Sequence, residues 1–221
     1  MFIGFQVYKP CLGIPKYLSF SQKNIYENPL AASMSSVQVP GAPDVPGLNF
    51  RRLIQPDDYP HLRQILLDSK DEDGLDYSET VEDIARYYRH LVNCDVDKDA
   101  LVAEVNGEPV GYARVWFNTK PDKSRKYHFF VNLKPDWRGK GIRTAILRWC
   151  ESRIAEIRGE GHENDVIHIW AMESEEHWRK LMESEGYELI RYFFIMVRPN
   201  LDNIPDYQLP EGLELRPVRP Q

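Results

Sequence analysis

Two glycines between a predicted strand and a predicted helix are the part of this sequence with the clearest chemical use. Gly139 and Gly141 follow an aromatic and β-branched run that ends at Leu133, and apolar residues at helical spacing begin at Ile142. The first N–H groups of a helix lack helical partners, and the positive end of the helix dipole lies there too. Because glycine lets an anion approach the backbone, this junction predicts a phosphate site, with an ordinary tight connection as the alternative.

Three side chains are candidates for a general base, which removes a proton best when its pKa is near the working pH. His128 lies on the strand before the glycine loop, His168 lies on the next predicted strand, and Glu104 ends an earlier strand. A satisfied or exposed structural role is the alternative for each of them. The six histidines and three cysteines show no paired ligand spacing, so we expect no metal site.

The elements that must position these residues are predicted from the period of the apolar residues and from turn signals. Asp58, Ser78 and Ser174 are typical helix caps, and Asn106-Gly107 suits a tight hairpin turn. We expect strands at residues 48–54, 100–105, 109–118, 126–133, 166–172 and 187–197, and helices starting near residues 58, 78, 142 and 174. The order is therefore β-α-α-β-β-β-α-β-α-β, which is an α+β fold.

Length and composition limit the classes of protein to which this chain can belong. A chain of 221 residues with 42% hydrophobic residues can bury one core, which favours one domain with tails. The net charge of −6 disfavours nucleic-acid binding as the main function. No segment has the pattern of a signal peptide or the length of a membrane span, and the three cysteines are widely spaced. We therefore expect a cytoplasmic protein with no nucleic-acid or membrane partner.

The first 46 residues are rich in Pro, Ser, Asn and Gly and show no hydrophobic period. This composition predicts a disordered tail or linker over residues 1–46. Met34 followed by Ser35-Ser36 would make an ordinary start of a chain, so we expect residues 1–33 to be dispensable or to be an over-extended gene start.

The order Leu133-x-Pro135-x-x-Arg138-Gly139-x-Gly141-Ile142 resembles the acyl-CoA loop of the GNAT acyltransferase superfamily. The last strand, helix, glycine and aromatic strand resemble the end of the same fold, so the resemblance covers most of residues 48–197. It implies a mixed, mostly antiparallel central sheet flanked by helices. In this family the loop amides bind the pyrophosphate of coenzyme A, and the preceding strand pairs with the pantetheine arm. The implied acetyl-CoA-binding residues are Leu133, Arg138, Gly139, Lys140, Gly141, Ile142 and Arg143.

The resemblance implies an N-acetyltransferase that moves an acetyl group from its cosubstrate acetyl-CoA to a primary amine by direct attack. The acceptor would be a small-molecule amine or a peptide amine. Three positions depart from the family, because Arg143 replaces Gly or Ala, Met182 replaces a tyrosine acid, and Glu175 replaces a common asparagine. Since methionine donates no proton, a non-catalytic acyl-CoA-binding regulatory half of a tandem protein is the alternative.

An acidic stretch from Asp68 to Asp76 is predicted to form the loop between the first two helices. In the GNAT fold this connection borders the acceptor groove, where carboxylates would raise the local concentration of a cationic amine. An ordinary solvated surface loop is the alternative, since acidic loops are common.

The segment from Gly212 to Val218 repeats the pattern of Gly47 to Leu53, with glycine, leucine, polar, apolar and arginine residues in the same order. It follows a Pro-rich segment, where a second unit would begin. This layout resembles tandem GNAT proteins such as mycothiol synthase. We therefore expect a tail at 1–46, a GNAT domain at 47–198, and a linker with the start of a second GNAT unit at 199–221. A second GNAT domain or a second copy in a homodimer is the expected protein partner.

Overall fold

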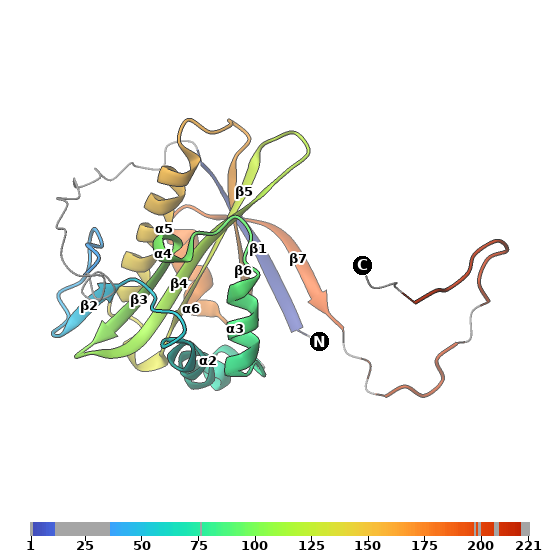
Figure 1. The fold of residues 1–221 in the computed structure, drawn as a ribbon, viewed down its shortest axis with the longest axis horizontal. Coiled ribbons are helices and arrows are strands. Elements are labelled where there is room, and N and C mark those ends of the chain that lie inside the picture. The colour runs from blue at the N-terminus through green and yellow to red at the C-terminus, as the bar shows by residue number, and fades with distance from the viewer. Residues whose placement is uncertain are drawn as a thin grey trace.

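A seven-stranded sheet with helices on both faces positions every residue of interest (Figure 1). The computed structural model describes residues 2–11, 36–75, 77–196, 198, 200–205 and 208–217. The strands lie in the order β2-β3-β4-β5-β6-β1-β7, and neighbours are antiparallel except β5 and β6, which are parallel. The strands are β1 (Phe2–Pro10), β2 (Leu48–Arg51), β3 (Ala100–Val105), β4 (Glu108–Thr119), β5 (Arg125–Leu133), β6 (Val166–Met172) and β7 (Glu188–Ile195). The helices are α2 (Tyr59–Asp73), α3 (Val81–Arg89), α4 (Val96–Asp99), the 3-10 helix η1 (Pro135–Trp137), α5 (Ile142–Arg158) and α6 (Glu176–Ser184).

From β2 onward the elements confirm the predicted α+β fold with its mixed, mostly antiparallel sheet. The predicted helices and strands follow one another in the predicted order, with the short α4 and η1 added. Asn106 and Gly107 join β3 to β4 with φ values of 52° and 82°, the positive values that a tight hairpin turn requires. In the part of the chain that the structure describes, no helix is both long and apolar enough to cross a membrane.

The sheet separates two hydrophobic cores, one under α5 and α6 and one under α2 and α3. Alternation along β5 explains this division, because Tyr127, Phe129 and Val131 face the first core while Phe130 faces the second. The apolar face of α5 supplies fully buried side chains such as Ile146, each of which contributes roughly 1.5–3 kcal/mol by burial. The two cores hold both faces of β5 in place.

The expectation that residues 1–46 lack regular structure is wrong for the first strand. Phe2–Pro10 forms β1, which pairs with β6 on one side and β7 on the other. Val7 is buried in the core under α5, and Lys9 donates to the carboxylate of Glu151 on α5 at 2.8 Å. The prediction failed because the composition of the long Pro- and Ser-rich segment was applied to the short apolar run at its start. Residues 12–35 lie outside the described residues, so the expectation for them stays a prediction.

The start and end of α2 also differ from the sequence-based expectation. Asp58 precedes the helix, but its side chain makes no capping bond and instead accepts from Arg51 at 2.6 and 2.8 Å. The predicted acidic loop is helical as far as Asp73, because α2 continues to Gly74 at a φ of 62°. Thr80, not Ser78, caps α3 through a capping box with Asp83.

The C-terminal segment carries no helix or strand in its described residues, 200–205 and 208–217. Leu213 and Leu215, which belong to the repeated sequence pattern, are exposed. The second GNAT unit and the division of the chain at residues 46 and 198 therefore stay predictions.

Candidate functional site

The strands β5 and β6 separate soon after they begin, and the gap between them is the centre of the candidate site. Their parallel pairing is confined to Lys126 with Val166 and Tyr127 with Ile167, whereas β5 stays paired with β4 as far as Leu133. Among the described residues, no strand pairs with this edge of β5 beyond these two pairs, so another molecule could pair with it.

The backbone of β5 presents hydrogen-bonding groups to the gap. Lys134 donates its N–H to the main-chain O of Val110 on β4 at 2.9 Å. The N–H and C=O of a strand residue point to the same side and alternate along the strand, so Val131 and Leu133 turn theirs away from β4. One wall of the gap therefore carries backbone donors and acceptors.

His128 lies where β5 and β6 separate, and both of its ring nitrogens are engaged. Its Nδ1 lies 2.9 Å from the main-chain O of His168, so this nitrogen carries the proton, and its Nε2 lies 3.3 Å from the amide nitrogen of Asn118. The ring stacks on Trp116 with centroids 5.2 Å apart. Burial lowers the pKa of His128 and keeps the ring neutral. Its lone pair is therefore already occupied by a donor.

His168 lies across the gap on β6 and has one nitrogen without a partner. Its Nδ1 lies 3.2 Å from the amide nitrogen of Gln6 on β1, while its Nε2 is buried and makes no hydrogen bond. Burial, followed by the charges of Lys126 and His128, lowers the pKa of His168 to about 4. The ring is neutral at pH 7. With the Gln6 amide nitrogen donating to Nδ1, the proton of the neutral ring lies on Nε2. A flip of the Gln6 amide exchanges the two roles and places the lone pair on Nε2.

The structure does not bring Glu104, the third predicted base, to the gap. Glu104 lies on β3, and β4 stands between β3 and β5. Its carboxylate accepts a hydrogen bond from Arg51 at 2.5 Å. Among the described residues, no group of three or more His, Cys, Asp or Glu side chains is placed to hold a metal ion.

The glycine loop follows the open edge of β5 directly and presents unpaired amides. Gly139 and Gly141 have φ values of 72° and 81°, which side chains rarely adopt. The first helical bond of α5 runs from Ala145 N–H to the main-chain O of Gly141 at 3.1 Å. Within the described residues, the amides from Gly139 to Thr144 have no protein acceptor. A β-carbon added to Gly139 would meet open space, so the loop faces an accessible region.

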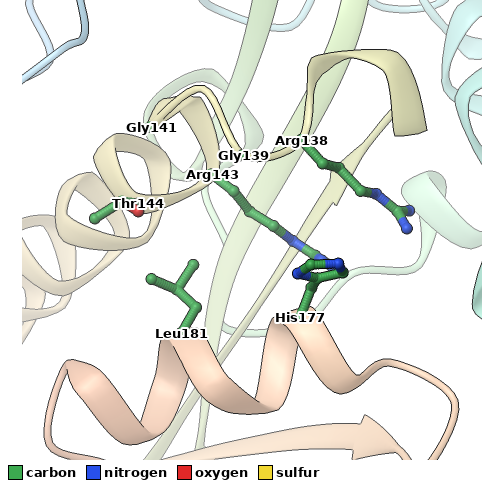
Figure 2. Close-up of a pocket in the computed structure, with 7 residues that line it drawn as sticks. All are labelled: Arg138, Gly139, Gly141, Arg143, Thr144, His177 and Leu181. Atoms are coloured by element: carbon green, nitrogen blue, oxygen red, sulfur yellow. The ribbon is translucent and has the colours of Figure 1, made fainter.

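A pocket of about 310 Å³ lies in front of these amides (Figure 2). The two glycines contribute backbone, α6 contributes the other wall, and none of the lining residues is acidic. Arginine and histidine side chains together with a helix start make a favourable environment for an anion. The lining residues are Arg138, Gly139, Gly141, Arg143, Thr144, His177 and Leu181.

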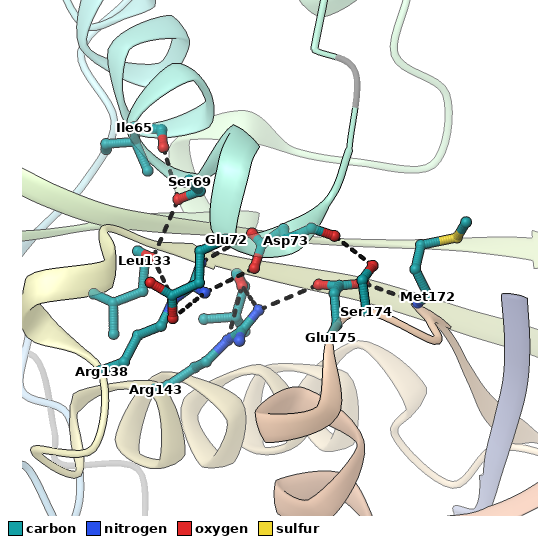
Figure 3. A network of polar contacts seen from close by, with 11 residues as sticks. Ile65, Ser69, Glu72, Asp73, Leu133, Arg138, Arg143, Met172, Ser174 and Glu175 are labelled. Carbon is teal, nitrogen blue, oxygen red and sulfur yellow. Dashed lines mark hydrogen bonds and ion pairs between the residues drawn. The ribbon is translucent and has the colours of Figure 1, made fainter. Parts of the chain in front are cut away.

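Arg138 ties the start of the loop to α2. Its Nε donates to the main-chain O of Leu133 at 3.1 Å, and its two terminal nitrogens donate to Asp73 at 2.7 and 2.9 Å (Figure 3). Glu72 lies 3.3 Å from the same guanidinium. This two-pronged pairing with Asp73 fixes the position of the planar guanidinium. Glu72 and Asp73 at the end of α2 are therefore engaged with arginine and are not free to attract an amine.

Arg143 extends from the first turn of α5 into the gap. Its Nε and Nη2 donate to the main-chain O of Val131 at 3.2 and 3.0 Å, and its guanidinium lies 4.4 Å from the ring centre of Trp178 on α6. Glu175 lies 3.7 Å away. Burial is the main cause that lowers the pKa of Arg143 to about 10, so the side chain is charged at pH 7. The departure from Gly or Ala thus places a cation against the open edge of β5.

The start of α6 uses its polar residues to join other elements. The carboxylate of Glu175 accepts from the N–H of Met172 at 2.9 Å, and the hydroxyl of Ser174 donates to the main-chain O of Asp73 (Figure 3). The expected Ser174 cap is therefore absent, and Glu175 occupies the cap position without a capping bond. Burial raises the pKa of Glu175. The Ser174 bond connects the start of α6 to α2, and the Glu175 bond connects it to the end of β6.

Met182, which stands at the position of the expected family acid, is fully buried on the inner face of α6 and is part of the core. Tyr77, which sequence reasoning missed, lies on the connection between α2 and α3 at the same end of the gap. Burial, followed by the charges of Glu175 and Asp73, raises the pKa of Tyr77. Its hydroxyl therefore keeps its proton at neutral pH.

Sequence reasoning found the loop but missed residues that come from other elements. Thr144, His177 and Leu181 line the pocket, and no local motif marks the last two. Thr144 could have been inferred, because it lies in the first turn of the helix that follows the loop. Of the predicted loop residues, Ile142 is fully buried, and Lys140 lies 4.4 Å from the ring centre of Trp137.

Comparisons with known proteins agree with this geometry. Residues 97–189 match the model of the family described as acetyltransferase (GNAT) domain. No curated protein matches the chain. A GCN5-related N-acetyltransferase from Sphaerobacter thermophilus has a similar structure, with a TM-score of 0.57 and 21% identity over 66% of this chain and 44% of that chain. This chain therefore spans less than half of that relative.

Two further solved structures share the fold over almost their whole length. A predicted acetyltransferase with acetyl-CoA from Clostridium acetobutylicum has a TM-score of 0.52 and 19% identity, covering 68% of this chain and 96% of that chain. A transcriptional regulator from Bacillus halodurans has a TM-score of 0.52 and 17% identity, covering 68% of this chain and 99% of that chain. Residues 97–189 therefore match the family model of the GNAT acetyltransferase domain, and the chain shares the fold of these structures.

Proposed function

We propose that this chain is an N-acetyltransferase that moves an acetyl group from acetyl-CoA to a primary amine by direct attack. The observation that carries the proposal is the open edge of β5, which leads directly to the unpaired amides of Gly139 to Thr144. An open strand edge followed by an anion site suits a ligand with a peptide-like arm and a diphosphate. A GNAT structure with acetyl-CoA has the same fold, which supports this choice of ligand.

The residues of this chain fit acetyl-CoA at two places. The loop amides and the start of α5 would hold the diphosphate, and the pocket beside them is lined by Arg138, Arg143 and His177. The N–H groups of Val131 and Leu133 would pair with the amide-containing arm, because the carbonyls of these two residues already accept from Arg143 and Arg138. When bound, the thioester supplies an activated acetyl group. The N–H of Leu133 faces the gap and would donate to the thioester oxygen, where negative charge develops.

Proton transfers need a base for the acceptor amine and an acid for the leaving thiolate. Of the two histidines, His168 has the unpartnered nitrogen, Nε2, which would accept the amine proton in the tautomer that turns Nδ1–H toward the Gln6 amide oxygen. Its pKa of about 4 makes it a weak base. Tyr77 keeps its proton and lies near Glu175 and Asp73, so it can donate a proton in place of the missing family tyrosine.

Arg143 favours the second candidate function, a non-catalytic acyl-CoA-binding half. Its two hydrogen bonds occupy the main-chain O of Val131, which an arm pairing with β5 would also use. The arm can bind only if this side chain moves, and the cation then becomes free to contact a phosphate. A side chain that stays in place would leave a diphosphate pocket without access for the thioester.

Calorimetry with acetyl-CoA, combined with a thiol-release assay over a panel of small amines and peptide N-termini, separates these functions. The proposed enzyme binds acetyl-CoA and releases thiol only when an acceptor is present. Binding without release for any acceptor would favour the non-catalytic half. Absence of binding would contradict both functions and leave only the fold.

A further inference from the structure

Arg114 on β4 is a buried cation enclosed by aromatic rings. The residue is only 1% exposed, and its guanidinium carbon lies 4.8 and 5.1 Å from the ring centres of Tyr87 and Tyr88 on α3. It lies 5.2 Å from the ring centres of both Trp116 and Phe130. Aromatic faces attract a cation, which explains how the side chain is retained in this position.

The aromatic rings leave most of the hydrogen-bonding capacity of Arg114 unused. Its Nη2 donates to the hydroxyl of Tyr87 at 2.8 Å, but within the described part of the chain its buried Nε and Nη1 have no partner, and neither does the buried hydroxyl of Tyr88. Guanidinium N–H groups point outward in the plane of the group, so a ring stacked above that plane does not accept from them. Two cationic donors and a hydroxyl are therefore buried together without acceptors.

No negative charge compensates Arg114 among the residues that the structure describes. No described carboxylate pairs with it, and the ionisable groups nearby are Tyr87, Tyr88, Cys94 and Tyr112. Burial raises the pKa of Tyr88 to about 12 and that of Cys94 to about 11, so both groups are neutral at pH 7. A buried cation is normally paired, which marks this position as unusual.

Arg114 lies on the face of the sheet that reaches the gap. It pairs across the ladder with Phe130 on β5, two residues beyond His128 on the same face. The ring centres of His128 and His168 lie 5.8 Å apart across the gap, and the ring centres of His168 and Trp170 also lie 5.8 Å apart. Trp170 is 51% exposed, so this face of the sheet is accessible beyond α3.

We propose that Arg114 binds a carboxylate of the acceptor, so that the substrate class is an amine that also carries a carboxylate and an apolar or aromatic body. The carboxylate would receive the Nε and Nη1 donors and the Tyr88 hydroxyl, and the body would lie against Trp116 and Phe130. This inference rests on the proposed function for the amine, but the carboxylate site itself can be tested without it.

Tyr87 provides access to the guanidinium. Its ring covers Arg114 on the outer side of α3, yet the residue is 56% exposed. Exposed side chains change rotamer within nanoseconds, so rotation of this ring uncovers the donors without unfolding α3. A bound carboxylate would replace the hydroxyl of Tyr87 as the hydrogen-bond partner of the guanidinium.

Calorimetry on the full chain without acetyl-CoA tests the site with three probes. The probes are L-phenylalanine, 2-phenylethylamine, which lacks the carboxylate, and 3-phenylpropionate, which lacks the amine. We expect the two carboxylates to bind at least tenfold more tightly than 2-phenylethylamine. We expect Arg114→Gln to remove this difference. The control Arg125→Gln should keep it, because Arg125 also lies over an aromatic ring, that of Phe117 at 4.6 Å.

Equal binding of L-phenylalanine and 2-phenylethylamine to the unaltered protein would overturn the inference, as would unchanged carboxylate binding by Arg114→Gln. If that variant does not fold, Arg114→Lys and Tyr88→Phe replace it. The first should retain part of the preference, and the second should weaken 3-phenylpropionate severalfold. Failure of the proposed function is distinguishable, because acetyl-CoA would then not bind while 3-phenylpropionate still does.

Discussion

The guanidinium of Arg143 donates two hydrogen bonds, at 3.2 and 3.0 Å, to the main-chain O of Val131. This contact joins the first turn of α5 to the edge of β5 that has lost its strand partner. It satisfies a carbonyl that would otherwise lie unpaired in the gap. It also makes the same carbonyl unavailable to a ligand. The Arg143 side chain therefore favours an anion at the loop but hinders an arm that pairs along β5.

Replacement of Arg143 by alanine should therefore have opposite effects on binding of the diphosphate and on binding of the arm that pairs with β5. The variant loses a cation of the phosphate pocket but frees Val131, so we expect weaker pyrophosphate binding and a larger ratio of coenzyme A affinity to pyrophosphate affinity. The ratio should rise about tenfold, the equivalent of one hydrogen bond of about 1.4 kcal/mol. Calorimetry with both ligands measures it. An unchanged ratio would mean that Arg143 does not obstruct the edge of β5.

Gly139→Ala should weaken acetyl-CoA binding more than it weakens the fold. A β-carbon at Gly139 meets no protein atom within 4 Å, so beyond the strain of a φ of 72° it acts only on what occupies the pocket. Gly107→Ala is a matched control, since Gly107 also has a positive φ, 82°, and open space. Both variants should lose similar unfolding free energy, roughly 1 kcal/mol, but only Gly139→Ala should lose affinity. Equal affinity in the two variants would place the diphosphate elsewhere.

The stability of the protein should fall between pH 6.5 and pH 4 because of His168. Its folded pKa of about 4 lies below the ordinary histidine value of 6.5, so the folded state favours the neutral ring. The resulting stability is fully present above pH 6.5 and is lost as the pH falls through about 4. The difference corresponds to about 3 kcal/mol at neutral pH. Urea unfolding of His168→Gln should show a flatter pH profile than urea unfolding of the unaltered protein.

Removal of residues 1–11 should destabilise the sheet, contrary to the expectation that residues 1–33 are dispensable. Among the described strands, β7 pairs only with β1, so the deletion removes its entire ladder. It also removes the bond from Lys9 to Glu151. Hydrogen exchange in β7 should accelerate to the rate of an unstructured segment, and the urea midpoint should fall. Deletion of residues 208–221 is the control, and equal exchange in both truncations would contradict the pairing.

The difference between the predicted and the observed site has a physical reason. The loop from Leu133 to Ile142 could be predicted because its residues are adjacent in sequence, and a local rule about helix starts applies to them. His177 and Asp73 reach the loop only through the packing of α6 and α2, which leaves no local signal. Arg114 was missed for the same reason, since its aromatic surroundings come from three elements.

Tyr77→Phe should lower turnover while leaving acetyl-CoA affinity unchanged. Burial, followed by the charges of Glu175 and Asp73, raises the pKa of Tyr77, so the hydroxyl is a proton donor over the whole neutral range. Loss of a positioned acid typically reduces the rate by about 100-fold or more. Tyr59→Phe is the matched control, because it removes a tyrosine hydroxyl that donates to Gln55 at 2.6 Å and takes no part in the proposed site. Thiol release by both variants, measured with one acyl donor that has a poor thiol leaving group and one that has a good one, distinguishes a general acid from a structural residue.

The defect of Tyr77→Phe should shrink with an acyl donor whose thiol has a low pKa, because such a thiolate needs no proton to leave. An equal defect with both donors would assign Tyr77 a structural role.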